Sequence, residues 1–300
     1  MFYKRRSSMG HGNNQHQQSF PPQHQGQQPG IESMMEPRPI IEDVNYVGSN
    51  KLANKVAIIT GGDSGIGAAA AIAFAKEGAD VVIPYYYTYE NEDAFRTKQK
   101  IEALGRYCLL IVGDLRDATH CKYVVHQTIE HFGKLDILVN NHAVQFIQKS
   151  LLDISEEQLD ATFQTNIYAY FYLTKAALPH LTSGDAIINT TSIVAYEGNE
   201  QLIDYSATKG AIVGFTRSLS QNLMKDGIRV NAVAPGPIWT PLIPSSYPAK
   251  QVKTFGQDAP MNRAGQPYEL APAYVYLASD DSSYVSGQVI HVNGGTIVSS

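Results

Sequence analysis

The sequence has little of what marks secreted, membrane-spanning or nucleic-acid-binding proteins. Its 300 residues include two cysteines, Cys108 and Cys121, which are too few for a disulfide framework, so both are expected to be reduced and buried. No apolar run approaches the ~20 residues of a membrane span, and the polar N-terminus does not resemble a secretory signal. The net charge of −5 provides no basic surface. We therefore expect a cytoplasmic protein with no nucleic-acid partner, no membrane partner and no metal site.

The composition changes near residue 50. Residues 1–30 are rich in Gln, His, Gly, Asn and Pro, which predicts a disordered tail, because such a segment cannot bury enough apolar surface to offset its ordering entropy. A metal site at His11, His16 and His24 is the alternative. Residues 31–50 are more apolar but interrupted by prolines, and we expect an extended arm lying over the domain or over a neighbouring subunit. Residues 51–300 then form the folded domain.

Apolar, strand-like runs alternate with amphipathic helical stretches from Lys55 onward. Several of these runs are apolar at every position, as expected for strands buried on both faces. The expected strands are Val56–Thr60, Asp80–Pro84, Tyr107–Val112, Ile137–Asn140, Ala186–Asn189, Ile228–Ala234 and Gln288–Val292. The expected helices are Ile66–Glu77, Glu92–Leu104, Ala118–Phe132, Glu156–Leu181, Tyr205–Lys225 and Tyr268–Ala278. The alternation predicts an α/β fold, a single doubly wound (Rossmann) domain with a mainly seven-stranded parallel sheet, plus an N-terminal extension.

A glycine-rich turn follows the first expected strand and opens the first expected helix. Glycines at 61, 65 and 67 allow a tight turn and a close approach of the backbone to a pyrophosphate, and the free N–H groups at the start of the helix face such an anion. The spacing is G-x-x-x-G-x-G. In this context it predicts a dinucleotide site, and the expected cofactor-binding residues are Thr60, Gly61, Asp63, Ser64, Gly65, Ile66 and Gly67.

The ends of the next strands should form the rest of the cofactor crevice. An acid after the second strand favours NAD, and an arginine there favours NADP, but Tyr85 and Tyr86 stand in that place and leave the NAD(P) preference open. Asp114, with Leu115 beside it, is a candidate acceptor for the adenine amine. Asn140 is a candidate to bridge neighbouring strands and contact ribose, and a purely local role at a strand end is the alternative for each.

Tyr205 and Lys209 stand four residues apart at the start of a long expected helix, and therefore lie on one helical face. A phenol with a pKa of ~10 exchanges protons poorly near neutrality, whereas a nearby ammonium favours the phenolate and lowers that pKa. The pair predicts a general acid/base for an alkoxide that forms as hydride reaches a carbonyl carbon. The lysine is also expected to hold the nicotinamide ribose.

Two further polar residues complete this predicted group. Ser192 ends the fifth strand, where its hydroxyl can hydrogen-bond the substrate oxygen. Asn166 lies inside an expected helix, where Asn is unfavourable, and is predicted to hold a water that links Lys209 to solvent. Taken alone, each of these residues is as consistent with a role in packing or helix capping as with a role in catalysis. Together they predict an oxidoreductase that moves a hydride between NAD(P) and a carbonyl or alcohol carbon, with Tyr205 as general acid/base.

With these motifs, residues 52–296 resemble the short-chain dehydrogenase/reductase family in its single-domain branch. The run T-G-G-D-S-G-I-G at residues 60–67 and the ending at His291 are similar to a bacterial general-stress oxidoreductase subgroup. The resemblance implies a homotetramer that pairs through the helices carrying Asn166 and Tyr205. His142 departs from the pattern, because the family has a small residue there. The resemblance also implies cofactor contacts from Pro235, Gly236, Ile238 and Thr240.

The loop from Trp239 to Gln257 is rich in proline and small residues and is predicted to cover the substrate as a mobile lid. We expect a small aldehyde, ketone or sugar as substrate, and His142 as a neutral part of the pocket wall rather than a catalytic group. A catalytically silent nucleotide-binding scaffold or sensor is the alternative function. The residues expected to line the substrate pocket are His142, Val144, Gln145, Val194, Tyr196 and Trp239.

Overall fold

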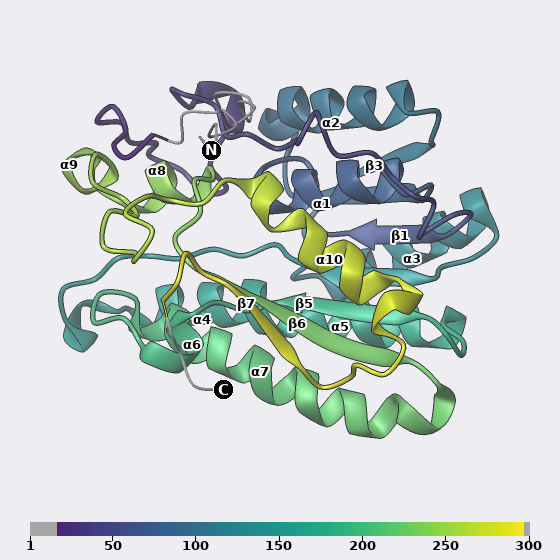
Figure 1. Cartoon of the computed structure of the whole chain (residues 1–300). Coiled ribbons are helices and arrows are strands. Elements are labelled where there is room, and N and C mark those ends of the chain that lie inside the picture. Colours follow the sequence, from purple (N-terminus) through teal and green to yellow (C-terminus); the bar gives the residue numbers. More distant parts are fainter. Residues whose placement is uncertain (1–16, 297–300) are drawn as a thin grey trace, which may run out of the picture.

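A seven-stranded parallel sheet forms the centre of the computed structural model, which describes residues 17–296 (Figure 1). The strand order is β3-β2-β1-β4-β5-β6-β7, and every neighbouring pair is parallel. The predicted doubly wound α/β domain is confirmed. The strands are β1 Val56–Ile59, β2 Asp80–Tyr85, β3 Cys108–Val112, β4 Ile137–Asn140, β5 Ala186–Thr190, β6 Arg229–Pro235 and β7 Val289–Val292.

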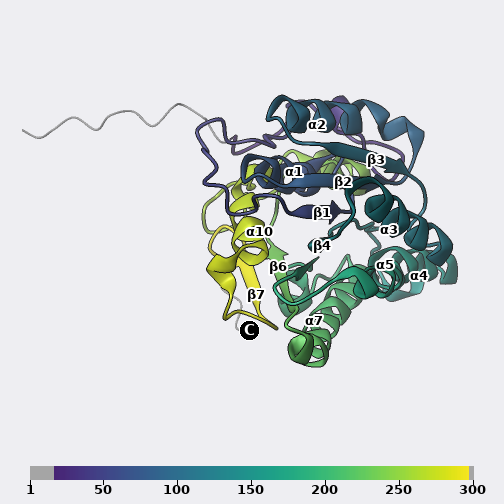
Figure 2. The same cartoon turned by 90° about the vertical axis from the view of Figure 1, so that its right-hand side faces the viewer.

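Helices cover both faces of the sheet because successive residues of the buried strands point to opposite sides. On β1, Ala57 and Ile59 pack against α1, α2 and α10, whereas Ile58 packs against α3 and α5 on the other face. Figure 2 shows these two groups of helices on opposite sides of the sheet. The α-helices are α1 Gly65–Lys76, α2 Asn91–Ala103, α3 Ala118–Phe132, α4 Glu156–Phe163, α5 Ala169–Ala177, α6 Val194–Glu197, α7 Ile203–Leu223, α8 Leu242–Ser246, α9 Ala249–Val252 and α10 Ala271–Ala278.

The single helix predicted over Glu156–Leu181 is wrong in detail. The structure has α4, a π-helical turn η4 (Gln164–Tyr168), α5 and a 3₁₀ turn η5 (Leu178–His180) in its place. Asn166 lies in the π-helical turn, and its side chain forms hydrogen bonds with the backbone of Val144. Such π-bulges are frequent at functional sites.

The disordered tail predicted for residues 1–30 is wrong for the part that the structure describes. Residues 1–16, with His11 and His16, lie outside the described residues. From residue 17 the chain packs on the domain, and Phe20 is 3% exposed in a cluster with Met35 and Trp239. The predicted extended arm over residues 31–50 carries a 3₁₀ turn, η1 (Glu32–Met34), and its Ile41 joins the core around α1.

Candidate active site

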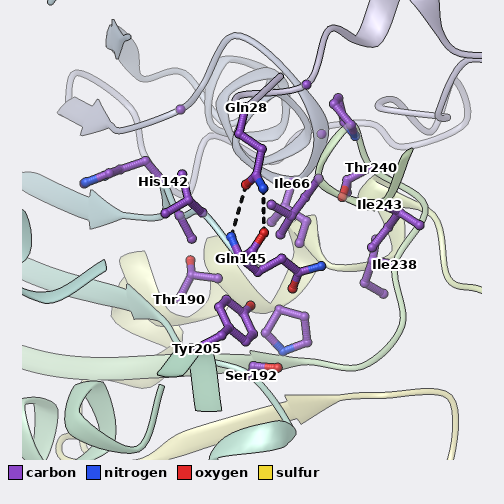
Figure 3. Close-up of a pocket in the computed structure, with 18 of the residues that line it drawn as sticks. Gln28, Ile66, His142, Gln145, Thr190, Ser192, Tyr205, Ile238, Thr240 and Ile243 are labelled. Atoms are coloured by element: carbon purple, nitrogen blue, oxygen red, sulfur yellow. Dashed lines mark hydrogen bonds between the residues drawn. The ribbon is translucent and has the colours of Figure 1, made fainter. Parts of the chain in front are cut away.

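One cavity of about 920 Å³ lies at the carboxyl ends of the strands (Figure 3). Ligands of doubly wound sheets bind in this position. The loop after β1, the ends of β2 and β3, the loops after β4, β5 and β6, and residues 28–30 of the N-terminal segment all contribute to its wall. The cavity is therefore assembled from segments that are far apart in the sequence.

The glycine loop fits a pyrophosphate. Gly61 and Gly65 have φ of 63° and 53°, a left-handed conformation that favours glycine. A Cβ on Gly67 would lie 2.1 Å from the Gly61 carbonyl oxygen, so α1 packs against the turn only with glycine there. Gly61, Asp63, Ser64, Gly65 and Ile66 line the cavity as predicted. Thr60 and Gly67 are not among the described lining residues. The Thr60 hydroxyl instead accepts the N–H groups after β4.

A glutamate from the N-terminal arm supports the glycine loop from behind, and the sequence pattern did not reveal it. Glu32 is 1% exposed, accepts the Gly65 N–H at 2.8 Å and pairs with the Arg96 guanidinium at 2.7 Å. Burial raises the pKa of this carboxyl to about 7 in spite of both contacts. The arm therefore contributes a buried contact directly to the cofactor loop.

Tyr85, Tyr86, Asp114 and Leu115 all line the cavity at the ends of β2 and β3, here called the adenosine end because adenosine contacts are predicted there. The structure adds Arg116, whose guanidinium lies 2.6 Å from the Asp114 carboxylate and 5.5 Å from the centre of the Tyr86 ring. Burial opposes ionisation of Asp114, but the hydrogen bonds from Arg116 outweigh it and hold the pKa of this carboxyl below its usual value. The base that was missing after β2 thus comes from the segment after the neighbouring strand β3.

Two buried acids also face this end of the cavity. Asp63 and Glu90 both line it, and burial raises the pKa of each carboxyl above its usual value. Repulsion from Asp93 raises the pKa of Asp63 further, and repulsion from Asp63 raises that of Glu90. Asp63 Oδ2 has no hydrogen-bond partner among the described residues. The adenosine end therefore carries one cation, Arg116, and three acids, Asp63, Glu90 and Asp114.

Tyr205, Ser192 and Lys209 converge at the opposite end of the cavity. All three line it, and the Ser192 hydroxyl is hydrogen-bonded to the Tyr205 phenol. The Lys209 ammonium lies 5.4 Å from the centre of the Tyr205 ring and donates to the Thr190 carbonyl oxygen at 2.9 Å. The first two turns of α7 therefore bring the predicted pair beside the end of β5.

The electrostatics of this group differ from the prediction. Burial raises the pKa of the Tyr205 phenol further than the hydrogen bond from Ser192 lowers it. Burial also lowers the pKa of the Lys209 ammonium to about 7. In the protein alone, desolvation therefore outweighs the stabilisation of the phenolate that the lysine was expected to give.

Asn166 holds the wall of the site in place without lining the cavity itself. Its Oδ1 accepts the Val144 N–H and its Nδ2 donates to the Val144 carbonyl oxygen, both at 2.9 Å. Nδ2 also donates to Thr208 Oγ1 at 3.1 Å, which ties the loop after β4 to α7. The water relay predicted for this residue stays a prediction.

Three predicted site residues occupy other places. Asn140 is fully buried and bridges to Asn189 at 3.0 Å, as one of its predicted roles required, but it is not among the described residues that line the cavity. Asn141 lines the cavity instead. Tyr196 packs against His291, and the fully buried Trp239 packs against Phe20. Neither side chain is part of the described cavity wall, so their prediction as pocket residues is wrong.

His142 lines the cavity as a neutral side chain. Burial, and then the nearby charge of Lys209, lower the pKa of its imidazole to about 4. Its Nδ1 lies 2.8 Å from Thr60 Oγ1 and its ring is tilted against Tyr170. This is the pocket-wall arrangement that we expected for the unusual histidine.

Seven further predicted residues also line the cavity. Val144, Gln145 and Val194 line the cavity near Ser192 and Tyr205. Pro235, Gly236, Ile238 and Thr240, after β6, line it as well. Gln28 and Tyr247 do so too and were missed. Nothing in the local pattern marks Gln28 as a site residue, because its contact lies 117 residues away at Gln145.

The glycine loop of this Rossmann domain faces a Ser, Tyr and Lys group across one cavity. This arrangement places the protein in the class of NAD(P)-dependent oxidoreductases. The family model described as "Enoyl-(Acyl carrier protein) reductase" matches residues 61–296. A short chain dehydrogenase from Burkholderia cenocepacia in complex with NADP superposes with a TM-score of 0.76, is 32% identical and is matched over 82% of this chain and 98% of its own. A blue fluorescent protein from a metagenomic library, in complex with NADPH, superposes with a TM-score of 0.75. It is 31% identical, and the match covers 82% of this chain and 98% of its own.

Sequence relatives agree with this result. The uncharacterized oxidoreductase YhdF of Bacillus subtilis is 64% identical over 93% of this chain and 96% of its own length. General stress protein 39 of the same organism is 57% identical over 93% of this chain and 97% of its own length. Glucose and ribitol dehydrogenase of Daucus carota is 53% identical over the same shares. The chain belongs to the short-chain dehydrogenase/reductase family and is an NAD(P)-dependent enzyme acting on CH–OH groups.

Proposed function

We propose that the enzyme interconverts the carbonyl group of small, neutral, hydroxylated aldehydes or ketones and the corresponding alcohols, with Tyr205 as general acid/base. The observation that carries the proposal is the meeting of the Ser192 and Tyr205 hydroxyls in one cavity, with the Lys209 ammonium beside the phenol. The alternative of a catalytically silent scaffold or sensor gives no reason for this arrangement.

In the proposed mechanism, Ser192 and Tyr205 bind the substrate oxygen between their hydroxyls. A nicotinamide held in the same cavity would supply or accept the hydride. Tyr205 donates its proton to the oxygen as the carbonyl is reduced and removes it again in the reverse direction. The Lys209 ammonium stabilises the phenolate at that moment. Asn166 positions the loop at Val144 through its two hydrogen bonds, and this keeps the opposing wall at a fixed distance from Tyr205.

The wall of the cavity supports a neutral, hydroxyl-rich substrate. Among the described lining residues the only cations are Arg116, at the adenosine end, and Lys209, beside Tyr205. An anionic substrate would therefore find no free positive charge to pair with it. Amide groups, which both donate and accept hydrogen bonds, suit sugar or polyol hydroxyls. The lining amides outside the glycine loop are Gln28, Asn141, Gln145, Asn199, Gln201 and Gln251. The name of the carrot relative, glucose and ribitol dehydrogenase, supports the same class.

We further propose a preference for NADP(H). Arg116 is the one cation among the described residues lining the adenosine end, and it lies against Tyr86 at the end of β2, where the ribose 2′ position is read. An Arabidopsis thaliana relative, 50% identical over 92% of this chain, is named NADPH-dependent aldehyde reductase 1. Asp114 competes for the guanidinium, so the preference is expected to be moderate.

Assembly and location belong to the same proposal. Large apolar side chains are exposed on the helical layer that carries Asn166 and Tyr205, among them Leu159, Tyr168 and Phe171 at 42, 43 and 50%. Their exposure supports the proposed homotetramer, in which they would be buried between subunits. Both cysteines are free and buried, which fits the reducing cytoplasm. In the described part of the chain, no helix has the length and hydrophobicity of a membrane span.

The test is an activity assay on the full-length protein with NADPH and NADH. The panel contains glyceraldehyde, glucose and ribitol as hydroxylated substrates, and hexanal and an acyl thioester as apolar ones. We expect turnover of at least one hydroxylated substrate with a higher kcat/KM than either apolar compound. Binding of NADPH without turnover of any compound would favour the scaffold or sensor, and preference for the thioester would contradict the proposed substrate class.

A further inference from the structure

The N-terminal segment 17–30, here called the strap, lies across the segment 241–257, which contains α8 and α9 and is here called the lid. Three backbone carbonyl oxygens of the lid lie at hydrogen-bond distance from the strap. The Phe20 N–H donates to the Lys253 oxygen at 3.1 Å, and the Gln25 N–H donates to the Pro244 oxygen at 2.7 Å. The His24 ring nitrogen Nδ1 is 3.0 Å from the Tyr247 oxygen. The lid that was expected to be mobile is therefore fastened along its length.

An aromatic stack anchors the start of the strap. The rings of Phe20 and Trp239 lie 3.7 Å apart at 7° to each other, and Phe20 is 3% exposed. Ile243 and Val252, one from each lid helix, belong to the same apolar cluster. Releasing the strap would therefore expose the indole and the inner face of both lid helices together.

The end of the strap reaches the substrate half of the cavity. Gln28 Nε2 donates to the Gln145 carbonyl oxygen at 2.5 Å, and the Gln145 N–H donates to Gln28 Oε1 at 3.1 Å. Figure 3 shows this pair on the side of the cavity opposite Tyr205 and Ser192. A Cβ on Gly30 would lie 2.3 Å from the Pro241 carbonyl oxygen, so the chain after Gln28 also packs closely on the start of the lid.

The side chain of Gln145 connects the two contacts. Its Nε2 donates to Ser246 Oγ, in α8 of the lid, at 3.1 Å, while its backbone is held by Gln28. Strap, lid and the loop after β4 thus form one continuous wall. Because that wall faces the catalytic hydroxyls, its position decides how large a group can stand beside the reacting carbonyl.

We propose that the strap is a specificity-determining part of the active site. Gln28 forms the substrate wall, and the docking of Phe20 keeps the lid in the position that selects small hydroxylated substrates over bulky apolar ones. The kinetic part of this proposal rests on the proposed function. The docking part of the proposal does not rest on the proposed function. Fluorescence of Trp239, the single tryptophan of the chain, measures the docking of the strap without any turnover.

The kinetic test compares Gln28→Ala with Gln27→Ala, a matched control because Gln27 is the exposed neighbour of the same type. Truncating Gln28 leaves the Gln145 backbone groups unpaired and widens the cavity. We expect KM for glyceraldehyde to rise about 10-fold and KM for benzaldehyde to fall, while the NADPH Kd stays unchanged. Equal kinetics of the two variants for both aldehydes would overturn the role of Gln28.

The docking test uses acrylamide quenching of Trp239 fluorescence in Phe20→Ala, with Phe95→Ala as control, since Phe95 is an exposed phenylalanine on α2. We expect weak quenching in the wild type and in Phe95→Ala, and quenching at least about threefold stronger in Phe20→Ala. Unchanged quenching in Phe20→Ala would overturn the docking of the strap. If the wild type turns over no aldehyde but this quenching result holds, the proposed function fails and the docking stands.

Discussion

The two halves of the cavity are built in different ways. The nucleotide half consists of strand ends and a glycine loop, and its key contacts are backbone groups held by a buried sheet. The substrate half consists of the strap, the lid and the loop after β4, and both backbone and side-chain hydrogen bonds hold them together over long sequence separations. The comparison teaches that one cavity can combine a rigid cofactor site with a substrate wall that depends on a peripheral segment.

The first prediction concerns Tyr205, which lies where the two halves meet. Replacing it by Phe removes the group that exchanges the proton and leaves the glycine loop untouched, so we expect kcat to fall by ~10² or more with little change in the NADPH Kd. Steady-state kinetics and nicotinamide fluorescence measure the two quantities.

Tyr196→Phe is the matched control for this change. The Tyr196 hydroxyl is buried without a hydrogen-bond partner among the described residues and is not part of the described cavity wall. Its removal should leave kcat within about twofold of the wild type. A Tyr205→Phe variant as active as Tyr196→Phe would remove Tyr205 from the mechanism.

The second prediction tests the rigidity of the nucleotide half. In Gly67→Ala the new Cβ would lie 2.1 Å from the Gly61 backbone oxygen and 2.8 Å from Asn141 Nδ2, so the turn must move. We expect the NADPH Kd to rise at least about 30-fold and the free energy of unfolding to fall by about 2 kcal/mol. Fluorescence titration and denaturant unfolding provide the measurements.

Gly210→Ala is the control for that substitution. Among the described residues, apart from the adjacent residues and the nearby backbone of its own helix, no atom lies within 4 Å of the position that a Cβ on Gly210 would take, and Gly210 is inside α7. Alanine there should leave cofactor binding unchanged and stabilise the helix by about 0.5–1 kcal/mol. Equal NADPH affinity of the Gly67 and Gly210 variants would show that the loop is not the rigid element we describe.

The third prediction concerns Arg116 at the adenosine end of the nucleotide half. Arg116→Ala should raise the NADPH Kd about 10-fold and the NADH Kd by less than about twofold, because only NADPH presents a 2′-phosphate to the guanidinium. Arg106→Ala, which removes a guanidinium paired with Asp80 away from the cavity, serves as control. An equal loss of affinity for both cofactors would mean that Arg116 only supports the adenine end.

The smallest predicted effect is the pH dependence of NADPH binding. Burial lowers the pKa of Lys209 to about 7, so its positive charge is present below pH 7 and is lost as the pH rises. We expect the NADPH Kd to increase about threefold more between pH 6 and 8 in the wild type than in Lys209→Met.

The comparison with Lys209→Met separates the lysine from other groups that titrate in this range. Asp63 and Glu90, whose pKa values are raised, also gain negative charge as the pH rises and weaken anion binding in both proteins. His142 stays neutral, since its pKa is about 4. Identical pH profiles for the wild type and Lys209→Met would contradict the shifted pKa of the lysine.

The nucleotide half could be predicted from the sequence because its signals are local. The seven strands follow from apolar runs, and the glycine loop from three glycines in the turn after β1 and the first turn of α1. Tyr205 and Lys209 needed only the periodicity of a helix. Arg116 was missed because its role depends on β2 and β3 lying side by side, although both segments were recognised.

The substrate half could not be predicted to the same extent, for a physical reason. The composition of residues 17–30 indicates disorder, yet Phe20 finds a partner in Trp239, 219 positions further along the chain. The same stack removes Trp239 from the pocket, where its place in the lid loop had suggested it. Gln28 and Glu32 gain their roles only through contacts with Gln145 and Gly65, which no local periodicity reveals.

The central claim is that this cavity transfers a hydride to a carbonyl carbon with Tyr205 supplying the proton. Single-turnover reaction of the full-length enzyme with NADPH carrying deuterium at both C4 positions of the nicotinamide, with glyceraldehyde as acceptor, tests it most directly. The account predicts that mass spectrometry finds one deuterium on the product carbinol carbon with the wild type, formed at least about 100-fold more slowly with Tyr205→Phe. Unlabelled product, or equal rates in the two proteins, would contradict it.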